Sequence, residues 1–260
     1  MNSHHFNPAG RLFEFMTVTW HSQNTQSIGA TWAGYLEVDL NDRSKLYAAL
    51  SQVLLLPDKA RSDIEALANP ILPKSQLLRP FDQVDLALEY VGSLTTQTAS
   101  VKEKFHQGTL SDLETASAFL NGRALSSDRL EDPEQIDDTL QTIRRLANEI
   151  MEDASTAGLA PDVARLLVEY AAAIVRAVDF YRIAGPEGIA AEFERMLGGV
   201  LWRPSAYVEV REKSPSTLSK IAEVSKNVIA LGALATFPAD LLLKGADVIS
   251  AIEQFFPPGP

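Results

Sequence analysis

Histidine is the side chain best suited to acid–base chemistry near neutral pH, and only two histidines lie outside the polar N-terminal stretch. These are His21 and His106, and a hydrolase would need a serine or threonine nucleophile beside one of them, with a carboxylate behind it. The sequence contains no G-x-S-x-G pattern. We therefore interpret both histidines as residues near helix C-termini, where a partial positive charge is stabilising. His4 and His5 form one isolated dipeptide, which we interpret as part of a terminal tail.

Carboxylates gather around the start of one expected helix, and such a group could bind a hard metal ion. The first set is Asp128, Glu131, Asp132, Glu134, Asp137 and Asp138, and the second is Glu149, Glu152 and Asp153. An EF-hand loop would also need a glycine and a terminal glutamate at fixed positions, and both are missing. This helix holds no Glu-x-x-His pair of the kind that di-metal carboxylate bundles use. We interpret both sets as solvated helix faces, and we predict no metal and no cofactor.

Two further kinds of chemistry are excluded by features that the sequence lacks. No G-x-x-x-x-G-K-[ST] loop occurs, and no G-x-G-x-x-G follows an expected strand, which excludes ATPase, kinase and dinucleotide-binding functions. Cysteine is absent, which excludes disulfides, cysteine zinc sites, iron–sulfur clusters and a thiol nucleophile. An enzyme would have to assemble its site from polar residues on several helices, with His21, His106 or Glu149 among them. The sequence therefore favours a protein that is not an enzyme.

The net charge of −11 limits the possible partners. Nucleic-acid binding requires clustered Lys and Arg, and no basic stripe with interleaved aromatic residues occurs, so we predict no nucleic-acid partner. Residues 1–10 have neither the cationic region nor the apolar region of a secretory signal. No stretch of about 18 continuous apolar residues is present. We expect a soluble cytoplasmic protein.

One stretch near the C-terminus is apolar enough to contact a partner or a membrane. Residues 227–243 carry a single charge, Asp240, and lysines precede them. An apolar helix with a basic flank can dock on a partner helix or insert into a membrane. Asp240, Pro238 and the short span favour a buried helical hairpin instead, so membrane contact is possible but less favoured. The candidate partner or membrane contacts are Val228, Leu231, Leu234, Leu241, Ile249, Ile252, Phe255 and Phe256.

The elements that position these residues centre on a helical hairpin over residues 132–185. Asp132 is a good N-cap, Pro133 suits the first helical position, and Gln135 stands where a capping box places it. Gly158 is expected to end this first helix. A second helix, apolar over much of its circumference, is expected from residue 161 to Gly185. The apolar stripe of the first helix follows three- and four-residue steps through Ile136, Leu140, Ile143, Ala147, Ile150 and Ala154.

Two segments outside the hairpin have ambiguous periodicity. Residues 11–20 alternate as a strand would, yet Leu12, Met16 and Trp20 also share one helical face. We favour a helix there, because a lone strand would lack a partner. Residues 205–211 are predicted to form a short extended piece within an irregular stretch.

Local signals indicate where the other helices begin and how the chain divides. Asp42 and Ser111 are expected to cap helices, Pro80 to open one and Pro57 to restart one. Residues 121–132 are polar and lie near the midpoint, so they are the best candidate linker, but their short length favours an ordinary loop. The expected organisation is a flexible tail over residues 1–10, a helical subdomain over 11–122, and the hairpin with the C-terminal helices over 123–260, packed as one compact unit.

Together these features predict an all-α fold, a multi-helix bundle built around the long central hairpin. Extensive helix without a catalytic constellation favours a non-enzymatic helical interaction protein, acting as scaffold, regulator or subunit of a larger assembly. The expected partner is another protein or a second copy of the chain. Two alternatives stay open: a membrane-acting effector that uses the apolar C-terminal helices, and an enzyme whose active site follows no known motif.

Overall fold

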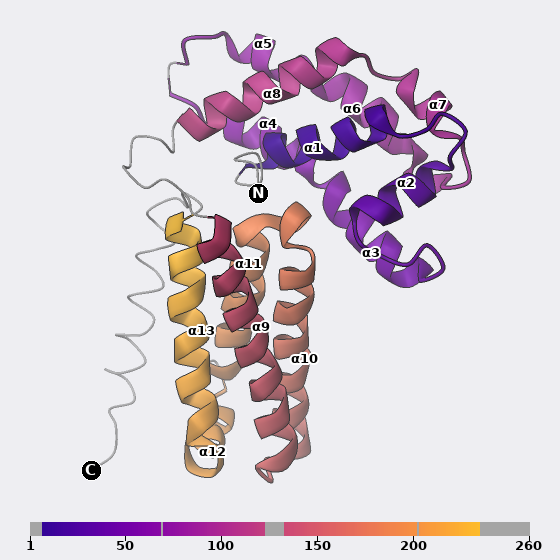
Figure 1. The fold of residues 1–260 in the computed structure, drawn as a ribbon. Coiled ribbons are helices and arrows are strands. Elements are labelled where there is room, and N and C mark those ends of the chain that lie inside the picture. Colours follow the sequence, from indigo (N-terminus) through magenta and orange to yellow (C-terminus); the bar gives the residue numbers. More distant parts are fainter. Residues whose placement is uncertain (1–6, 69, 123–132, 202, 235–260) are drawn as a thin grey trace. The chain divides into compact units, whose positions relative to one another are not determined.

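Helices make up the regular secondary structure of the computed structural model, which describes residues 7–68, 70–122, 133–201 and 203–234 (Figure 1). Within these residues there is no sheet, and an isolated antiparallel bridge joins Ser27 to Gln97. The prediction of an all-α, multi-helix fold is confirmed. The chain divides into two compact units, residues 1–128 and 129–260, and each is described by itself.

The first unit is built around α1. Its helices are α1 (Pro8–His21), α2 (Ile28–Tyr35), α3 (Arg43–Leu54), α4 (Leu56–Glu65), α5 (Lys74–Leu78), α6 (Phe81–Leu88), the 3-10 helix η2 (Glu89–Gly92), α7 (Thr98–Lys102) and α8 (Gln107–Gly122). α1 packs against α2, α4, α7 and α8. Leu12, Phe15, Met16 and Thr19 recur at three- and four-residue steps and are buried. The helical prediction for residues 11–20 is therefore confirmed, and the alternative of an extended segment is wrong.

The N-terminal end of α1 is fixed inside its unit. Asn7 is the N-cap: its Oδ1 atom accepts from the Gly10 N–H over 2.8 Å, and its Nδ2 atom donates to Asn121 Oδ1 over 2.7 Å. Pro8 takes the first helical position, where no N–H partner is needed. The predicted flexible tail is therefore wrong for residues 7–10, which are buried because they start a helix packed on α8. His4 and His5 lie outside the described residues.

Two loops, one before α2 and one before α7, pair with each other. Gly29 donates its backbone N–H to the Leu94 carbonyl over 2.9 Å, and Thr98 donates to the Gln26 carbonyl over 2.9 Å. The backbones approach so closely that a Cβ atom at position 29 would stand 2.8 Å from the Leu94 oxygen. The paired loops thus join segments 72 positions apart in the sequence.

Several expected helix boundaries are present in the first unit. Asp42 caps α3 by accepting the Lys45 N–H over 3.0 Å, Pro57 stands at the start of α4, and Pro80 precedes α6. The predicted cap at Ser111 is wrong. This residue lies one turn inside α8, because the helix begins at Gln107.

The second unit is a helical bundle that contains the predicted hairpin. Its helices are α9 (Pro133–Thr156), α10 (Pro161–Asp179), α11 (Tyr181–Leu201), α12 (Pro204–Lys213) and α13 (Pro215–Leu234). α9 packs against α10 and α13, and α11 packs against the same two, so these four helices close into a cycle (Figure 1). The predicted stripe of α9 is buried at all six positions, Ile136, Leu140, Ile143, Ala147, Ile150 and Ala154.

The break expected at Gly185 and Pro186 is present, but it falls inside α11. The preceding helix, α10, ends at Asp179, which is earlier than predicted. Gly185 has φ 68° and ψ −177°, a combination that is essentially restricted to glycine. The chain therefore turns at Gly185 and continues as helix from Pro186.

Residues 205–211 are helical, so the predicted extended piece is wrong. They belong to α12, which starts with Pro204 in the first turn. Ala206, Tyr207 and Val210 are buried at helical spacing, where α12 packs against α11 and α13. Tertiary packing outweighs the β propensity of this valine- and tyrosine-containing segment.

Candidate functional site

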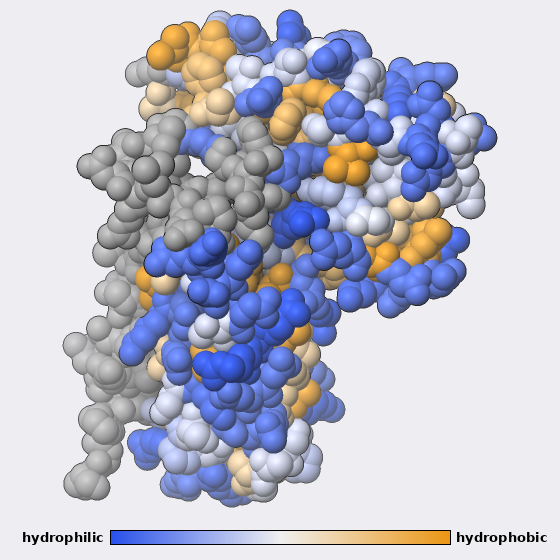
Figure 2. All heavy atoms as spheres, viewed as in Figure 1, coloured by the Kyte–Doolittle hydropathy of each residue, from blue (hydrophilic) through white to orange (hydrophobic). Residues whose placement is uncertain are grey.

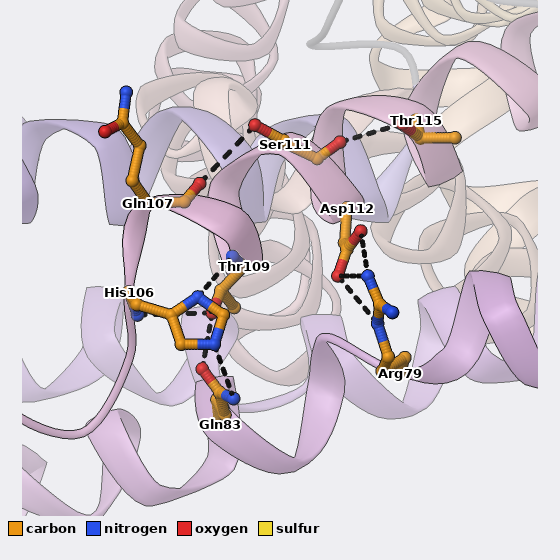
Figure 3. Close-up of polar contacts among 8 residues, drawn as sticks. All are labelled: Arg79, Gln83, His106, Gln107, Thr109, Ser111, Asp112 and Thr115. Atoms are coloured by element: carbon orange, nitrogen blue, oxygen red, sulfur yellow. Dashed lines mark hydrogen bonds and ion pairs between the residues drawn. The ribbon is translucent and has the colours of Figure 1, made fainter.

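His106 is the N-cap of α8 (Figure 3). The backbone N–H of Thr109 donates to His106 Nδ1 over 3.1 Å, and the backbone N–H of His106 donates to Thr109 Oγ1 over 3.3 Å. This is the reciprocal pattern of a capping box, with a ring nitrogen in place of the usual side-chain oxygen. The predicted place of His106 at a helix C-terminus is wrong, because the helix that precedes it, α7, ends at Lys102.

Both ring nitrogens of His106 lie within hydrogen-bond distance of polar neighbours. His106 Nδ1 lies 3.1 Å from the Thr109 backbone nitrogen and 3.3 Å from the Thr109 hydroxyl oxygen, so the ring tautomer decides whether Nδ1 accepts from the backbone or donates to the hydroxyl. Gln83 on α6 places its amide nitrogen 3.2 Å from His106 Nε2 and its amide oxygen 2.5 Å from Thr109 Oγ1. The Thr109 hydroxyl donates to the Gln83 amide oxygen, and the Gln83 amide N–H faces His106 Nε2, where the donor and acceptor roles depend on the tautomer of the ring. Both ring nitrogens are then engaged.

Gly108 has no side chain, and this leaves room for the His106 imidazole ring beside the first turn of α8. A Cβ atom at this position would lie 3.0 Å from both Cε1 and Nδ1 of His106. The run from His106 to Thr109 therefore carries a local signal for this cap. Sequence reasoning missed it because histidine is an unusual N-cap residue.

A second polar pair lies one turn farther along α8 (Figure 3). Asp112 accepts from Arg79 Nε over 2.9 Å and from Arg79 Nη2 over 2.7 Å at Oδ1 and 2.6 Å at Oδ2. The Thr115 hydroxyl donates to the Ser111 carbonyl over 2.8 Å. These contacts tie α8 to the end of α5 and to itself. The hydroxyl that lies beside the His106 ring is that of Thr109, 3.3 Å from Nδ1.

The other predicted polar residues also occupy structural positions. His21 is exposed in the last turn of α1, so its predicted place at a helix C-terminus is confirmed. No three or more His, Asp or Glu side chains are arranged to hold a metal ion within the described part of the chain. Asp128, Glu131 and Asp132 lie outside it.

In the second acidic set on α9, Asp153 contacts residues of α13 and is not only part of a solvated face. Asp153 Oδ2 accepts from Lys220 Nζ over 2.9 Å, from Ser216 Oγ over 3.0 Å and from Thr217 Oγ1 over 3.2 Å. Burial opposes the charge of this carboxyl, but the hydrogen bonds from Lys220, Ser216 and Thr217 outweigh it and lower the pKa of Asp153. The Asp153 hydrogen bond in turn raises the pKa of Lys220. The cluster joins α9 to α13, and its partners are too far apart in sequence to have been matched from spacing.

In the first unit, three carboxylates surround one arginine. Arg61 on α4 lies 3.3 Å from Asp58, 4.0 Å from Asp82 and in contact with Asp85, with its guanidinium 5.3 Å from the centre of the Phe81 ring. Burial lowers the pKa of Arg61, but the hydrogen bond and charge of Asp85 and the charges of the other two carboxylates raise it overall. No sequence pattern marks this group, because its members are spread over two helices.

Apolar side chains are exposed on the first unit. The partly exposed ones include Tyr47 and Leu54 on α3, Leu55 between α3 and α4, and Leu86 on α6, while Ile71 is almost fully exposed. Figure 2 shows apolar areas reaching the surface of this unit among hydrophilic neighbours. Isolated apolar side chains are common on surfaces, but two adjacent leucines at a helix junction form a small contact area.

Among the candidate contacts near the C-terminus, the structure describes the side chains of Val228 and Leu231. Val228 and Leu231 on α13 are buried within the second unit. The side chain of Leu234 and the residues Leu241, Ile249, Ile252, Phe255 and Phe256 lie outside the described part of the structure. No helix among the described residues is long and apolar enough to cross a membrane.

Comparison with protein-family models, with curated proteins and with solved structures finds no match to this chain. Any functional conclusion therefore depends on the residues themselves.

Proposed function

We propose that this chain is a non-enzymatic helical interaction protein, a scaffold, regulator or subunit that contacts another protein through its first unit. The observation that carries the proposal is the exposed leucine pair Leu54 and Leu55, at the junction of α3 and α4. Two adjacent leucines that are both about half exposed present more apolar surface than the single apolar side chains that ordinary protein surfaces carry.

The polar candidates support the same proposal. His106 Nδ1 takes part in the α8 cap and Nε2 contacts Gln83 on α6, while Asp153 takes part in the contact between α9 and α13. Residues used in this way stabilise helices. The Thr109 hydroxyl beside the ring is likewise used, since it accepts from the His106 backbone N–H and donates to Gln83. The alternative of a membrane-acting effector depends mostly on residues 235–256, which lie outside the described structure, and it stays a prediction.

The test compares a double variant, Leu54→Ser with Leu55→Ser, with the control Ile71→Ser, which replaces a single exposed apolar side chain of the same unit. The wild-type protein is expected to recover a stoichiometric partner from native extract, or to have a dimeric mass by light scattering. The double variant should lose that partner or that mass, and the control should keep it. A monomeric wild-type protein without a stoichiometric partner would contradict the proposal.

A further inference from the structure

Exposed leucines of the first unit lie beside exposed carboxylates. Leu54 is 44% exposed, Leu55 47% and Leu86 46%. Asp58 follows Leu55 by three positions in the first turn of α4, and Asp82 precedes Leu86 by four positions on α6. On a helix these spacings place side chains on the same face, so each leucine site has a carboxylate one turn away.

In the two segments that carry these leucines, carboxylates outnumber cations. Residues 54–65 and 80–92 contain six Asp or Glu and two Lys or Arg, which gives a net charge of −4. The side chains of Asp58 and Asp82 are 87% and 95% exposed, so both remain open to a further partner. Arg61 is shared among Asp58, Asp82 and Asp85, and one positive charge cannot neutralise three carboxylates.

We infer that the partner contributes a cationic amphipathic helix, whose apolar side chains contact Leu54, Leu55 and Leu86 while its Lys or Arg side chains pair with Asp58 and Asp82. This inference rests on the proposed function, and it adds the chemistry of the partner. An amphipathic helix offers apolar and basic side chains one turn apart, which matches the spacing on α4 and α6. The same carboxylates would repel an anionic lipid surface, so a protein segment fits better than a membrane.

The test uses the full-length chain and two labelled peptides of about 18 residues, long enough to form a helix. One peptide contains Leu and Lys in an amphipathic pattern, and the other has Glu in place of every Lys. Binding is measured by fluorescence anisotropy, and circular dichroism and urea unfolding show that each protein variant is folded. The Lys peptide should bind and weaken as salt rises from about 50 to about 200 mM, and the Glu peptide should not bind.

Variants distinguish this surface from general attraction to an acidic protein. The double variant Asp58→Asn with Asp82→Asn should weaken the Lys peptide about tenfold, since it removes two exposed ion pairs. The matched control, Asp137→Asn with Asp138→Asn, removes the same charge from exposed positions of α9 and should leave the affinity within about twofold. Leu54→Ser with Leu55→Ser should also weaken binding.

Three results would overturn the inference. Equal weakening by the α9 control would mean non-specific charge attraction. Equal binding of both peptides, lost in the leucine variant, would leave the leucines as a contact area and remove the preference for a cationic helix. Absence of peptide binding, together with loss of the native partner in the leucine variant, would overturn the inference but leave the proposed function intact.

Discussion

The backbone N–H of Thr109 donates to the ring of His106 over 3.1 Å, and the backbone N–H of His106 donates in return to the Thr109 hydroxyl over 3.3 Å. The Thr109 hydroxyl therefore satisfies the backbone donor of His106, and the His106 ring shares the Thr109 N–H with the His106 carbonyl, which lies 2.9 Å from that nitrogen. The pair fixes the first turn of a helix that packs against α1.

Thr109→Val should destabilise the first unit by about 1 kcal/mol, because it removes the hydroxyl that accepts from His106 and keeps the volume of the side chain. Thr109→Ser retains the hydroxyl and should stay close to wild type. Urea unfolding followed by tryptophan fluorescence is a suitable measurement, since Trp20 lies 5.5 Å from Phe105, the residue before His106. Equal stability of the valine and serine variants would show that the hydroxyl contributes nothing.

Gly29→Ala should cost about 1–3 kcal/mol, because the new Cβ would lie 2.8 Å from the Leu94 oxygen and 2.9 Å from Leu94 Cβ. The control is Gly34→Ala in the same helix, where a Cβ meets nothing within 4 Å. There the greater helix propensity of alanine should add up to about 1 kcal/mol. Thermal unfolding of both variants should therefore shift in opposite directions, and a shift in the same direction would contradict the close approach of the two loops.

Asp153→Asn should lower stability by about 1–2 kcal/mol at neutral pH, because it removes the charge that accepts from Lys220, Ser216 and Thr217. The pKa of Asp153 is lowered in the folded protein, so its contribution is complete above the unfolded value of about 3.9 and is lost as pH falls through the folded value. The difference between variant and wild type should therefore shrink in acid.

Urea unfolding at about pH 7 and at successively lower pH measures that difference. Glu152→Gln, an equal charge change at an exposed position of the same helix, is the control and should change stability by less than about 0.5 kcal/mol. A difference between Asp153→Asn and wild type that stays constant into strong acid would show that the carboxylate charge is not what holds α9 to α13.

Gly185→Asn should destabilise the second unit by about 1–3 kcal/mol, since φ 68° with ψ −177° is strained for any side chain. Gly158 also has a positive φ, 63°, but it follows a helix end, where asparagine is tolerated, and a Cβ there meets nothing within 4 Å. Gly158→Asn should therefore change stability by less than about 1 kcal/mol. Similar losses in the two variants, measured by urea unfolding, would contradict this distinction.

Helix faces and boundaries could be predicted from the sequence wherever the signal is local. The stripe of α9, the cap at Asp42 and the restart at Pro57 depend on residues within a few positions of each other. The prediction failed at residues 205–211, where β-branched and aromatic residues suggested an extended segment and packing against α11 and α13 determines a helix. It also failed at Asn7, whose side chain is held by a hydrogen bond to Asn121, a residue 114 positions later in the sequence.

The polar clusters could not be predicted, because their members come from separate helices. Asp153 and Lys220 stand 67 positions apart, and Gln83 and His106 stand 23 positions apart. No spacing rule connects such residues, and both clusters depend on how the helices pack.

The paired loops also influence the order in which the two units fold. Asn7 reaches Ser117 across 110 positions, and Thr31 reaches Thr98 across 67, so the first unit must close long chain segments before these contacts form. α9 and α10 are consecutive helices that pack directly on each other. Since native structures rich in local contacts form faster, we expect the α9–α10 hairpin to gain amide-exchange protection before the paired loops do during refolding.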